Sequence, residues 1–464
     1  MKVFGKIYIG LFVFFTVFGA YALDLPVKEI NGREYYYYAV ENGESLLSIA
    51  RDLGVSRDDI VKYNPRAADG VRQGTTIYLP VSEFASINFE EEDTEQDIIA
   101  EDTTESRRVT IALMQALMLN DTTENKTSRN ATEFVRGFML GVNYYKDNGI
   151  EADIYVYDTE NSPEVVAETM GNVTMDYVDV VVAPNDAESL HVIADEFRSP
   201  DGYILNMFAV QDSTHYTNPR VIQGNTHNTV LYEKATDAII ENFAGYTPVF
   251  LISKNGRNEK VNFTNYVRER YAEAGLPTIE MSFNNMLSSK GFEQLDSTEN
   301  YVFIPLSGSL NEFNKFARAL RTFRDNHFDP SSIALFGYPD WTTFRNEALE
   351  NLYNIEATIY SRFFDDMNDE ETYTFRELYE YYYGCEMPEQ VPSQALMGID
   401  AALYIFDNLS KNESLFIPQQ SDGFRGIQSS MNLDGNNDNM AGLANQAVYI
   451  ITFRQNKQAY VEVR

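Results

Sequence analysis

The sequence has few of the residues that build metal sites and disulfides: one Cys and four His among 464 residues. One Cys excludes a disulfide scaffold and every multi-thiolate metal site, and four scattered His exclude most histidine-rich centres. Basic residues are also scarce, because 36 Lys and Arg stand against 70 Asp and Glu, for a formal net charge of −34. Phosphate binding needs clustered Lys and Arg, so nucleic acid is excluded as the main partner.

After the N-terminal segment, no stretch of the sequence has 18 apolar residues in a row. At the N-terminus, two lysines precede an apolar run over residues 7–18, and small residues follow at Ala20 and Ala22. This pattern predicts a secretory signal peptide over residues 1–22. The alternative is an uncleaved anchor, for which the run is short against a span of ~20 residues. The mature protein is expected to be periplasmic or exported, without a transmembrane segment.

Three blocks follow the signal peptide. Residues 33–81 form a compact aromatic block, and residues 82–106 contain ten Asp and Glu with no Lys or Arg. Such a run repels itself and predicts an extended linker; an acidic docking tail is the alternative. Residues 107–464 are long enough for two α/β lobes, roughly 107–230 and 231–464, with crossovers near the C-terminus.

The aromatic block reads as strand, helix, helix, strand. Tyr36, Tyr38 and Val40 alternate as in a short half-buried strand, and Ile77 and Leu79 repeat the alternation at the other end. Between them, apolar residues recur at helical spacing in two short stretches. The second stretch stops where a proline follows an asparagine, because the residue before proline avoids the helical region.

These residues resemble the lysin motif (LysM) family over nearly the whole block. The family pattern is a Tyr-x-Val strand, Gly-Asp-Thr-Leu, Ile-Ala, an Asn that ends the second helix, and Leu-x-x-Gly-x-x-Leu-x-Ile-Pro. It stands here, with mild replacements, as Tyr38-x-Val40, Gly43-Glu44-Ser45-Leu46, Ile49-Ala50, Asn64-Pro65 and Val71-x-x-Gly74-x-x-Ile77-x-Leu79-Pro80. The resemblance implies binding of N-acetylglucosamine polymers, chiefly bacterial peptidoglycan, in a shallow groove.

The same resemblance implies the groove residues, which flank the loop after the first strand and the loop before the last. They are Gly43, Glu44, Ser45, Leu46, Arg66 and Ala67. Backbone N–H and C=O groups would pair with acetamide groups, and a small apolar patch would hold the methyl group. For Leu46 and Ile49 the alternative is a purely structural role in the turn and core.

The third block alternates strands and helices at the spacing of a doubly wound parallel sheet. Residues 178–182 contain only Val and Asp, which is typical of a parallel strand buried on both faces. Ser162 followed by Pro163 begins a helix as an N-cap with proline at the first helical position. The pattern restarts after residue 230, so the sequence predicts two α/β sheets that face each other across a cleft.

This block resembles the type I periplasmic solute-binding proteins of the branched-chain amino-acid receptor kind, over most of residues 107–463. The segments that carry the resemblance are Tyr157-Asp158-Thr159 with Pro163, Val178-Asp179-Val180-Val181-Val182-Ala183-Pro184, Ala274-Gly275-Leu276, Gly398-Ile399-Asp400-Ala401 and Leu433-Asp434-Gly435-Asn436. The resemblance implies a bilobal fold built from two doubly wound parallel sheets.

Ligands of such sheets lie beyond the carboxyl ends of the strands. Eight cleft candidates follow from that rule: Gln115, Asn185, Asp186, Gln211, Asp212, Ser307, Tyr338 and Asp340. The family holds an amino-acid carboxylate with hydroxyls and helix N-terminal amides, whereas Asp186 and Asp212 would repel a carboxylate. The family's ligand therefore carries over poorly, and the alternative is that all eight are ordinary loop residues.

Catalytic and metal motifs are missing. The sequence has no H-E-x-x-H, P-loop or G-x-G-x-x-G, and Ser307-Gly308-Ser309 lacks the G-x-S-x-G elbow. Cys385 has no His within 50 residues, and the segment after Asp434 lacks the Gly and the acid that a calcium loop needs. No catalytic residue, cofactor or metal ion is expected.

The sequence as a whole predicts a non-enzymatic protein of the bacterial cell envelope. The LysM block would bind peptidoglycan, and the bilobal block would regulate or scaffold wall processes with an envelope protein partner. The alternative is a solute-binding protein that senses or delivers a small ligand, such as an amino acid or muropeptide, in the interlobe cleft. A wall tether argues against delivery, because a transport receptor must diffuse to its permease.

Overall fold

The chain separates into two compact units, Met1–Thr104 and Glu105–Arg464, each considered by itself. The computed structural model describes residues 26–30, 33–40, 46, 49–50, 53, 55, 57–65, 67, 71, 74–81, 107–121, 125–145, 150–327, 329–366, 369–412, 416–418, 423–435 and 441–464. The predicted signal peptide and acidic linker lie outside these residues. No helix among them combines the length and apolar character that a membrane crossing needs.

The first unit contains a three-stranded antiparallel sheet in the order β1–β2–β3. Its elements are β1 (Val27–Ile30), β2 (Arg33–Ala39), α2 (Arg57–Tyr63) and β3 (Thr76–Pro80). Strand β1 precedes the block that the sequence singled out. The apolar residues that alternate in β2 and β3 meet those of the helical stretches in one core, whose members include Tyr36, Ile49, Ile60 and Ile77.

The first lobe of the second unit is a seven-stranded sheet in the order β16–β17–β8–β7–β6–β4–β5. Its strands are β4 (Arg107–Gln115), β5 (Ile150–Asp158), β6 (Val180–Val182), β7 (Tyr203–Asn206), β8 (Val221–Gln223), β16 (Leu433–Gly435) and β17 (Leu443–Asn445). All neighbours are parallel except β16 and β17. Residues 180–182 are fully buried, as expected for a central parallel strand.

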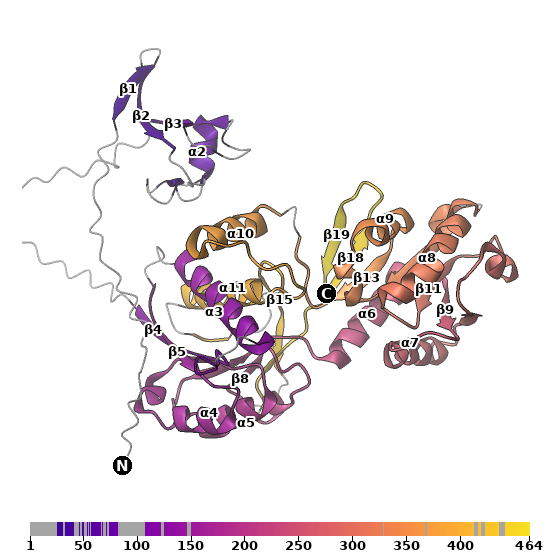
Figure 1. Ribbon diagram of the computed structural model, residues 1–464, viewed down its shortest axis with the longest axis horizontal. Coiled ribbons are helices and arrows are strands. Elements are labelled where there is room, and N and C mark those ends of the chain that lie inside the picture. The colour runs from indigo at the N-terminus through magenta and orange to yellow at the C-terminus, as the bar shows by residue number, and fades with distance from the viewer. Residues whose placement is uncertain are drawn as a thin grey trace, which may run out of the picture. The chain divides into compact units, whose positions relative to one another are not determined.

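Helices cover both faces of this sheet (Figure 1). They are α3 (Lys126–Tyr144) and α11 (Gln394–Lys411) on one face, α4 (Pro163–Met170) and α5 (Ala187–Glu196) on the other, and α10 (Glu370–Tyr383), which packs against α3 and α11. The capping residues read from the sequence are in place, because the side chain of Ser162 accepts a hydrogen bond from Val165 N at the start of α4.

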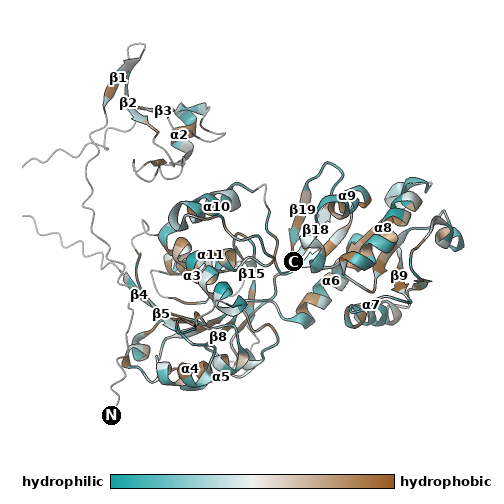
Figure 2. Ribbon diagram, in the orientation of Figure 1, coloured by the Kyte–Doolittle hydropathy of each residue, from teal (hydrophilic) through white to brown (hydrophobic). Residues whose placement is uncertain are grey.

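The second lobe is a seven-stranded sheet in the order β10–β9–β11–β12–β13–β18–β19. Its strands are β9 (Thr247–Ser253), β10 (Ile279–Phe283), β11 (Tyr301–Pro305), β12 (Ile333–Gly337), β13 (Thr358–Ser361), β18 (Tyr449–Phe453) and β19 (Ala459–Val463). Its helices are α6 (Asn228–Asn242), α7 (Val261–Glu273), α8 (Leu310–Asp325) and α9 (Asn346–Ile355). In Figure 2 the strand β9 is mostly brown, hence apolar, whereas the outer turns of α8 are largely teal, hence polar.

The predicted α/β class is confirmed, and the two doubly wound parallel sheets that the sequence predicted are present as two parallel-rich sheets. The sheets are mixed rather than wholly parallel, because β18 pairs antiparallel with β13 and β19, and β16 pairs antiparallel with β17. The C-terminal chain contributes to both lobes, since β16 and β17 extend the first sheet and β18 and β19 extend the second.

Helices α3 and α11 approach each other backbone to backbone. A Cβ atom at Gly398 would overlap the carbonyl oxygen of Phe134, and one at Gly137 would overlap that of Ala395. A Cβ at Gly141 would lie 2.7 Å from Cβ of Ala402. The glycines therefore allow the close contact that seals Phe134 and Phe138 against the sheet.

We expect Gly398→Ala to lower the free energy of unfolding by about 2–3 kcal/mol, because the added methyl group forces the two helices apart. At a helix position without such contact, the same change would stabilise by about 1 kcal/mol. Urea unfolding followed by circular dichroism measures the difference. Gly423→Ala is the control, since its Cβ would meet only the carbonyl oxygen of Met431 at 3.8 Å; equal stability of the two variants would contradict the packing argument.

Candidate functional site

The predicted groove of the first unit lies only partly within the described residues. Leu46 and Ala67 are 7% and 4% exposed and belong to the core of that unit. Ile49 is fully buried beside them, so the structural role considered for Leu46 and Ile49 agrees with their burial. Gly43, Glu44, Ser45 and Arg66 lie outside the described residues, and their place in a groove stays a prediction.

Two motif residues of the first unit have clear conformational roles. The side-chain amide of Asn64 donates to the carbonyl oxygens of Ile60, at 2.9 Å, and Tyr78, at 2.8 Å. Its Oδ1 accepts from Tyr78 N at 2.9 Å, so one side chain joins the end of α2 to β3. Gly74 has φ = +85°, a conformation that favours glycine.

In the first lobe, the cleft candidates follow the carboxyl ends of β4, β6 and β7. Gln115 is buried, and its Nε2 donates to the carbonyl oxygen of Ala183 at 3.4 Å, which joins the ends of β4 and β6. Asn185 is exposed. Asp186 is the N-cap of α5, and its Oδ1 accepts from Ser189 N at 2.7 Å. The carboxylate thus uses an amide at the start of the helix.

Asp212 is 8% exposed, whereas the preceding Gln211 is exposed. Its Oδ2 lies 2.6 Å from Nε2 of His191, and its Oδ1 accepts from Thr214 N at 2.8 Å. Burial alone would raise the pKa of Asp212, but the hydrogen bonds from Thr214 and His191 outweigh burial and lower it. The lowered pKa favours the ionised form of the Asp212 carboxyl group at neutral pH.

In the second lobe, Ser307 follows β11 and is 2% exposed. Its hydroxyl donates to Oε1 of Glu259 at 2.8 Å, and Gly308 N donates to the same oxygen at 2.9 Å. Ser309 then caps α8 by accepting from Glu312 N. Donors beside the start of α8, where the helix dipole favours an anion, are thus occupied by the chain's own carboxylate.

The structure places Tyr338 in the core of the second lobe rather than on a cleft wall. It is fully buried, and its hydroxyl donates to the carbonyl oxygen of Pro305; burial raises its pKa well above the usual range. Asp340 is exposed, and its Oδ2 pairs with Nζ of Lys260 at 2.6 Å. That Nζ also lies 5.1 Å from the centre of the Tyr338 ring.

Glu259 and Lys260 thus connect Ser307, Tyr338 and Asp340, although sequence reasoning missed both. The available signal was a Glu–Lys pair shortly after a predicted strand, but no pattern tells which loop it meets. A second missed pair is Asn206 and Gln223, both buried, whose side chains join at 2.7 Å between Nδ2 and Oε1 at the ends of β7 and β8.

Two surface hollows stand apart from these edges. One, of about 190 Å³, is lined by Met286, Leu287, Lys315, Arg318, Ala319 and Thr322. A smaller one, of about 10 Å³, lies beside α11. Neither is lined by a cleft candidate. Within the described part of the chain, no three His, Cys, Asp or Glu side chains come together in a way that would hold a metal ion.

No protein-family model matches the chain, and no curated protein matches it by sequence. A solved structure of a putative branched-chain amino acid ABC transporter protein from Rhodospirillum rubrum is similar in fold, with 12% identity and a TM-score of 0.51 over 77% of this chain and 99% of that one. The LpoA C-domain from Haemophilus influenzae, a regulator of PBP1A, is also similar, with 15% identity and a TM-score of 0.46 over 76% of this chain and 99% of that one. LivJ from Streptococcus pneumoniae in complex with isoleucine has 14% identity and a TM-score of 0.42 over 77% of this chain and 100% of that one. The similarity to the Rhodospirillum rubrum structure, together with the two parallel-rich sheets, shows that the second unit has a type I periplasmic-binding-protein fold.

We expect Asp212→Asn to destabilise the protein by about 1 kcal/mol at pH 7. Because the folded pKa of Asp212 is lowered, its ionised form stabilises the fold above the unfolded pKa, near 4. That contribution is lost as pH falls through the folded pKa, so the two proteins should converge in stability in acid. Urea unfolding at a series of pH values measures this difference in the free energy of unfolding, with Asp195→Asn, at an exposed position, as the control. A difference that does not change with pH would contradict the stabilising role of the ionised Asp212.

Proposed function

We propose that this protein is a non-enzymatic component of the bacterial cell envelope. The first unit binds peptidoglycan as a LysM module, and the second unit presents a bilobal surface for the regulation or scaffolding of wall processes. The observation that carries the proposal is the LysM pattern from Tyr38 to Pro80, on a unit whose strands pair as the pattern requires. The predicted signal peptide over residues 1–22 supports export to the compartment that holds peptidoglycan.

The conformational roles of the pattern residues support the LysM assignment. Asn64 closes the second helix against β3, and Gly74 adopts the positive φ that its turn needs. Asn64 therefore ends the helix and Gly74 forms the turn, as their positions in the pattern imply. One shallow groove is expected to bind glycan at about micromolar Kd or more weakly, so retention on an insoluble polymer is the suitable assay.

The edges of the two sheets favour a scaffold over an amino-acid receptor. Ser307 Oγ and Gly308 N, the donors beside α8, donate hydrogen bonds to Glu259. At the start of α5, Ser189 N donates to Asp186. A ligand carboxylate would have to displace Glu259 in the second lobe or approach Asp186 and the ionised Asp212 in the first. Either step costs electrostatic free energy.

Peptidoglycan retention tests the first half of the proposal. We expect the mature chain to sediment with purified sacculi, and a chain without residues 33–81 to remain largely in the supernatant, because the groove lies in the deleted block. Equal sedimentation of both chains would contradict the role of the LysM block. Release of soluble fragments from the sacculi would instead show a wall hydrolase.

A ligand screen tests the second half. We expect no change in Tm with leucine, acetate or a muropeptide for the native chain, and a rise of about 1 °C or more with acetate for Glu259→Ala. The variant frees two donors for a carboxylate, whereas the control Glu273→Ala removes a carboxylate at an exposed position of α7, away from these donors. A rise in Tm of the native chain with leucine or the muropeptide would favour the solute-binding alternative.

A further inference from the structure

We propose that a buried hydrogen-bond network centred on Asn445 locks the two lobes of the second unit in one orientation, so that this unit works without opening and closing its cleft. The inference goes beyond the proposed function and does not depend on peptidoglycan binding. It concerns the three passages of the chain between the lobes. The first crossover, 224–228, joins β8 to α6; the second, 362–366, leaves β13 toward α10; the third, 445–449, joins β17 to β18.

Asn445 uses the full bonding capacity of its amide. It is 4% exposed, and Nδ2 donates to the carbonyl oxygens of Gly224, at 2.9 Å, and Ser430, at 2.8 Å. Oδ1 accepts from Asn432 N and Ala447 N, both at 2.9 Å. Two donors and two acceptor positions are all that an amide offers. One side chain therefore holds together the ends of β8 and β17, from which the first and third crossovers leave, and the segment that runs into β16, all at the edge of the first sheet.

Thr226 extends the network to the second crossover. It is 1% exposed, and its hydroxyl donates to the carbonyl oxygen of Ala447 at 2.7 Å. Its own carbonyl oxygen accepts from Nε of Arg362 at 2.6 Å, and the same guanidinium bonds Oδ1 of Asn228. The first crossover is thus bonded to the third through Ala447 and to the start of the second through Arg362.

Two further contacts anchor the crossovers to the lobes. The hydroxyl of Ser430, in the short strand β15 (Ser430–Met431), lies 2.8 Å from that of Tyr449 in β18. The carbonyl oxygen of Gln428 accepts from Phe364 N at 2.8 Å. The backbone around Gln428 is itself held by Asp400 of α11, whose fully buried carboxylate accepts from Ser429 N at 2.9 Å and Ser429 Oγ at 2.7 Å.

Cleft closure in two-lobed proteins requires hinge residues that absorb changes in φ and ψ. Here the hinge backbone is paired with buried side chains, and moving one crossover past another would leave Asn445 or Thr226 without partners. A buried polar group that loses its partner pays its full desolvation cost. Rotation of one lobe against the other would therefore cost free energy, because it would break these buried hydrogen bonds.

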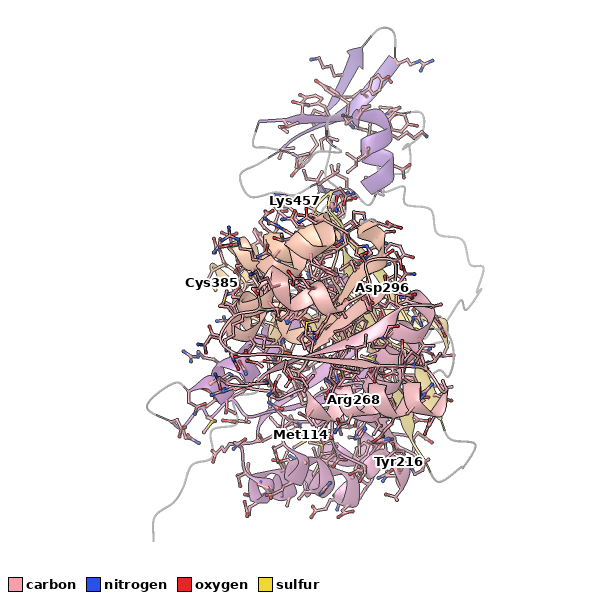
Figure 3. The ribbon with its side chains drawn as sticks, turned by 90° about the vertical axis from the view of Figure 1, so that its right-hand side faces the viewer. Met114, Tyr216, Arg268, Asp296, Cys385 and Lys457 are labelled. Atoms are coloured by element: carbon pink, nitrogen blue, oxygen red, sulfur yellow. The ribbon has the colours of Figure 1, made fainter. Side chains whose placement is uncertain are left out.

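Distance measurement between the lobes tests the lock on the full chain. Cys385 is the single cysteine, is exposed at the end of α10 and lies at the edge of the molecule (Figure 3), so it accepts a spin label without mutation. Asn314→Cys, at an exposed position of α8, supplies the label on the second lobe. We expect one narrow distance distribution by pulsed electron paramagnetic resonance, unchanged by 10 mM leucine.

Asn445→Ala should broaden that distribution by at least about twofold, because the crossovers lose their common partner. Thr226→Val removes only the hydroxyl and should broaden it as well, and it replaces Asn445→Ala if circular dichroism shows that the latter is unfolded. The exposed Asn456, whose side-chain amide bonds Gln458 two residues further on, supplies the control Asn456→Ala. A broad or two-peaked distribution in the native background, a shift with leucine, or no broadening in a folded variant would overturn the lock.

Discussion

The side-chain amide of Asn445 is the contact on which the arrangement of the second unit depends. It bonds the segment after β8, the segment before β16 and the segment before β18. The first and the last of these pass between the two lobes, each of which has its own apolar core. Each lobe buries its own apolar residues, so hydrophobic packing stabilises each lobe without specifying their mutual orientation. Directional hydrogen bonds between the crossovers supply that specification.

Carboxylates of the chain itself occupy hydrogen-bond donors at the carboxyl ends of the strands in both lobes. The chain has a large excess of acids, and several of them occupy donors that would otherwise be free: Asp186 at α5, Asp212 beside His191, and Glu259 beside α8. An ionised carboxylate near a helix N-terminus is stabilised by the dipole and the free amides. The same donors cannot then bind a second anion at the same time.

Much of the fold was predictable, because the strands and helices of the second unit follow local periodicity and local caps. The antiparallel strands β18 and β19 were not, since β19 joins the sheet through β18, and β18 pairs with β13 between residues 94 positions apart, such as Thr358 and Thr452. The cleft candidates were predictable only as a set. The rule that ligands bind beyond the carboxyl ends of the strands identifies the loops, but it does not predict where each side chain points. The side chain of Tyr338 points into the core, and that of Glu259 bonds Ser307.

The sequence by itself determined the α/β class of the second unit, the LysM pattern and the scarcity of metal-binding side chains, because periodicity, motifs and composition are local or additive properties. Only the tertiary structure decided which donors at the sheet edges are already occupied and how the crossovers are joined. The physical reason is distance along the chain: Asn445 and Gly224 are 221 residues apart, and a hydrogen bond between them exists only once β8 and β17 have paired in the first sheet.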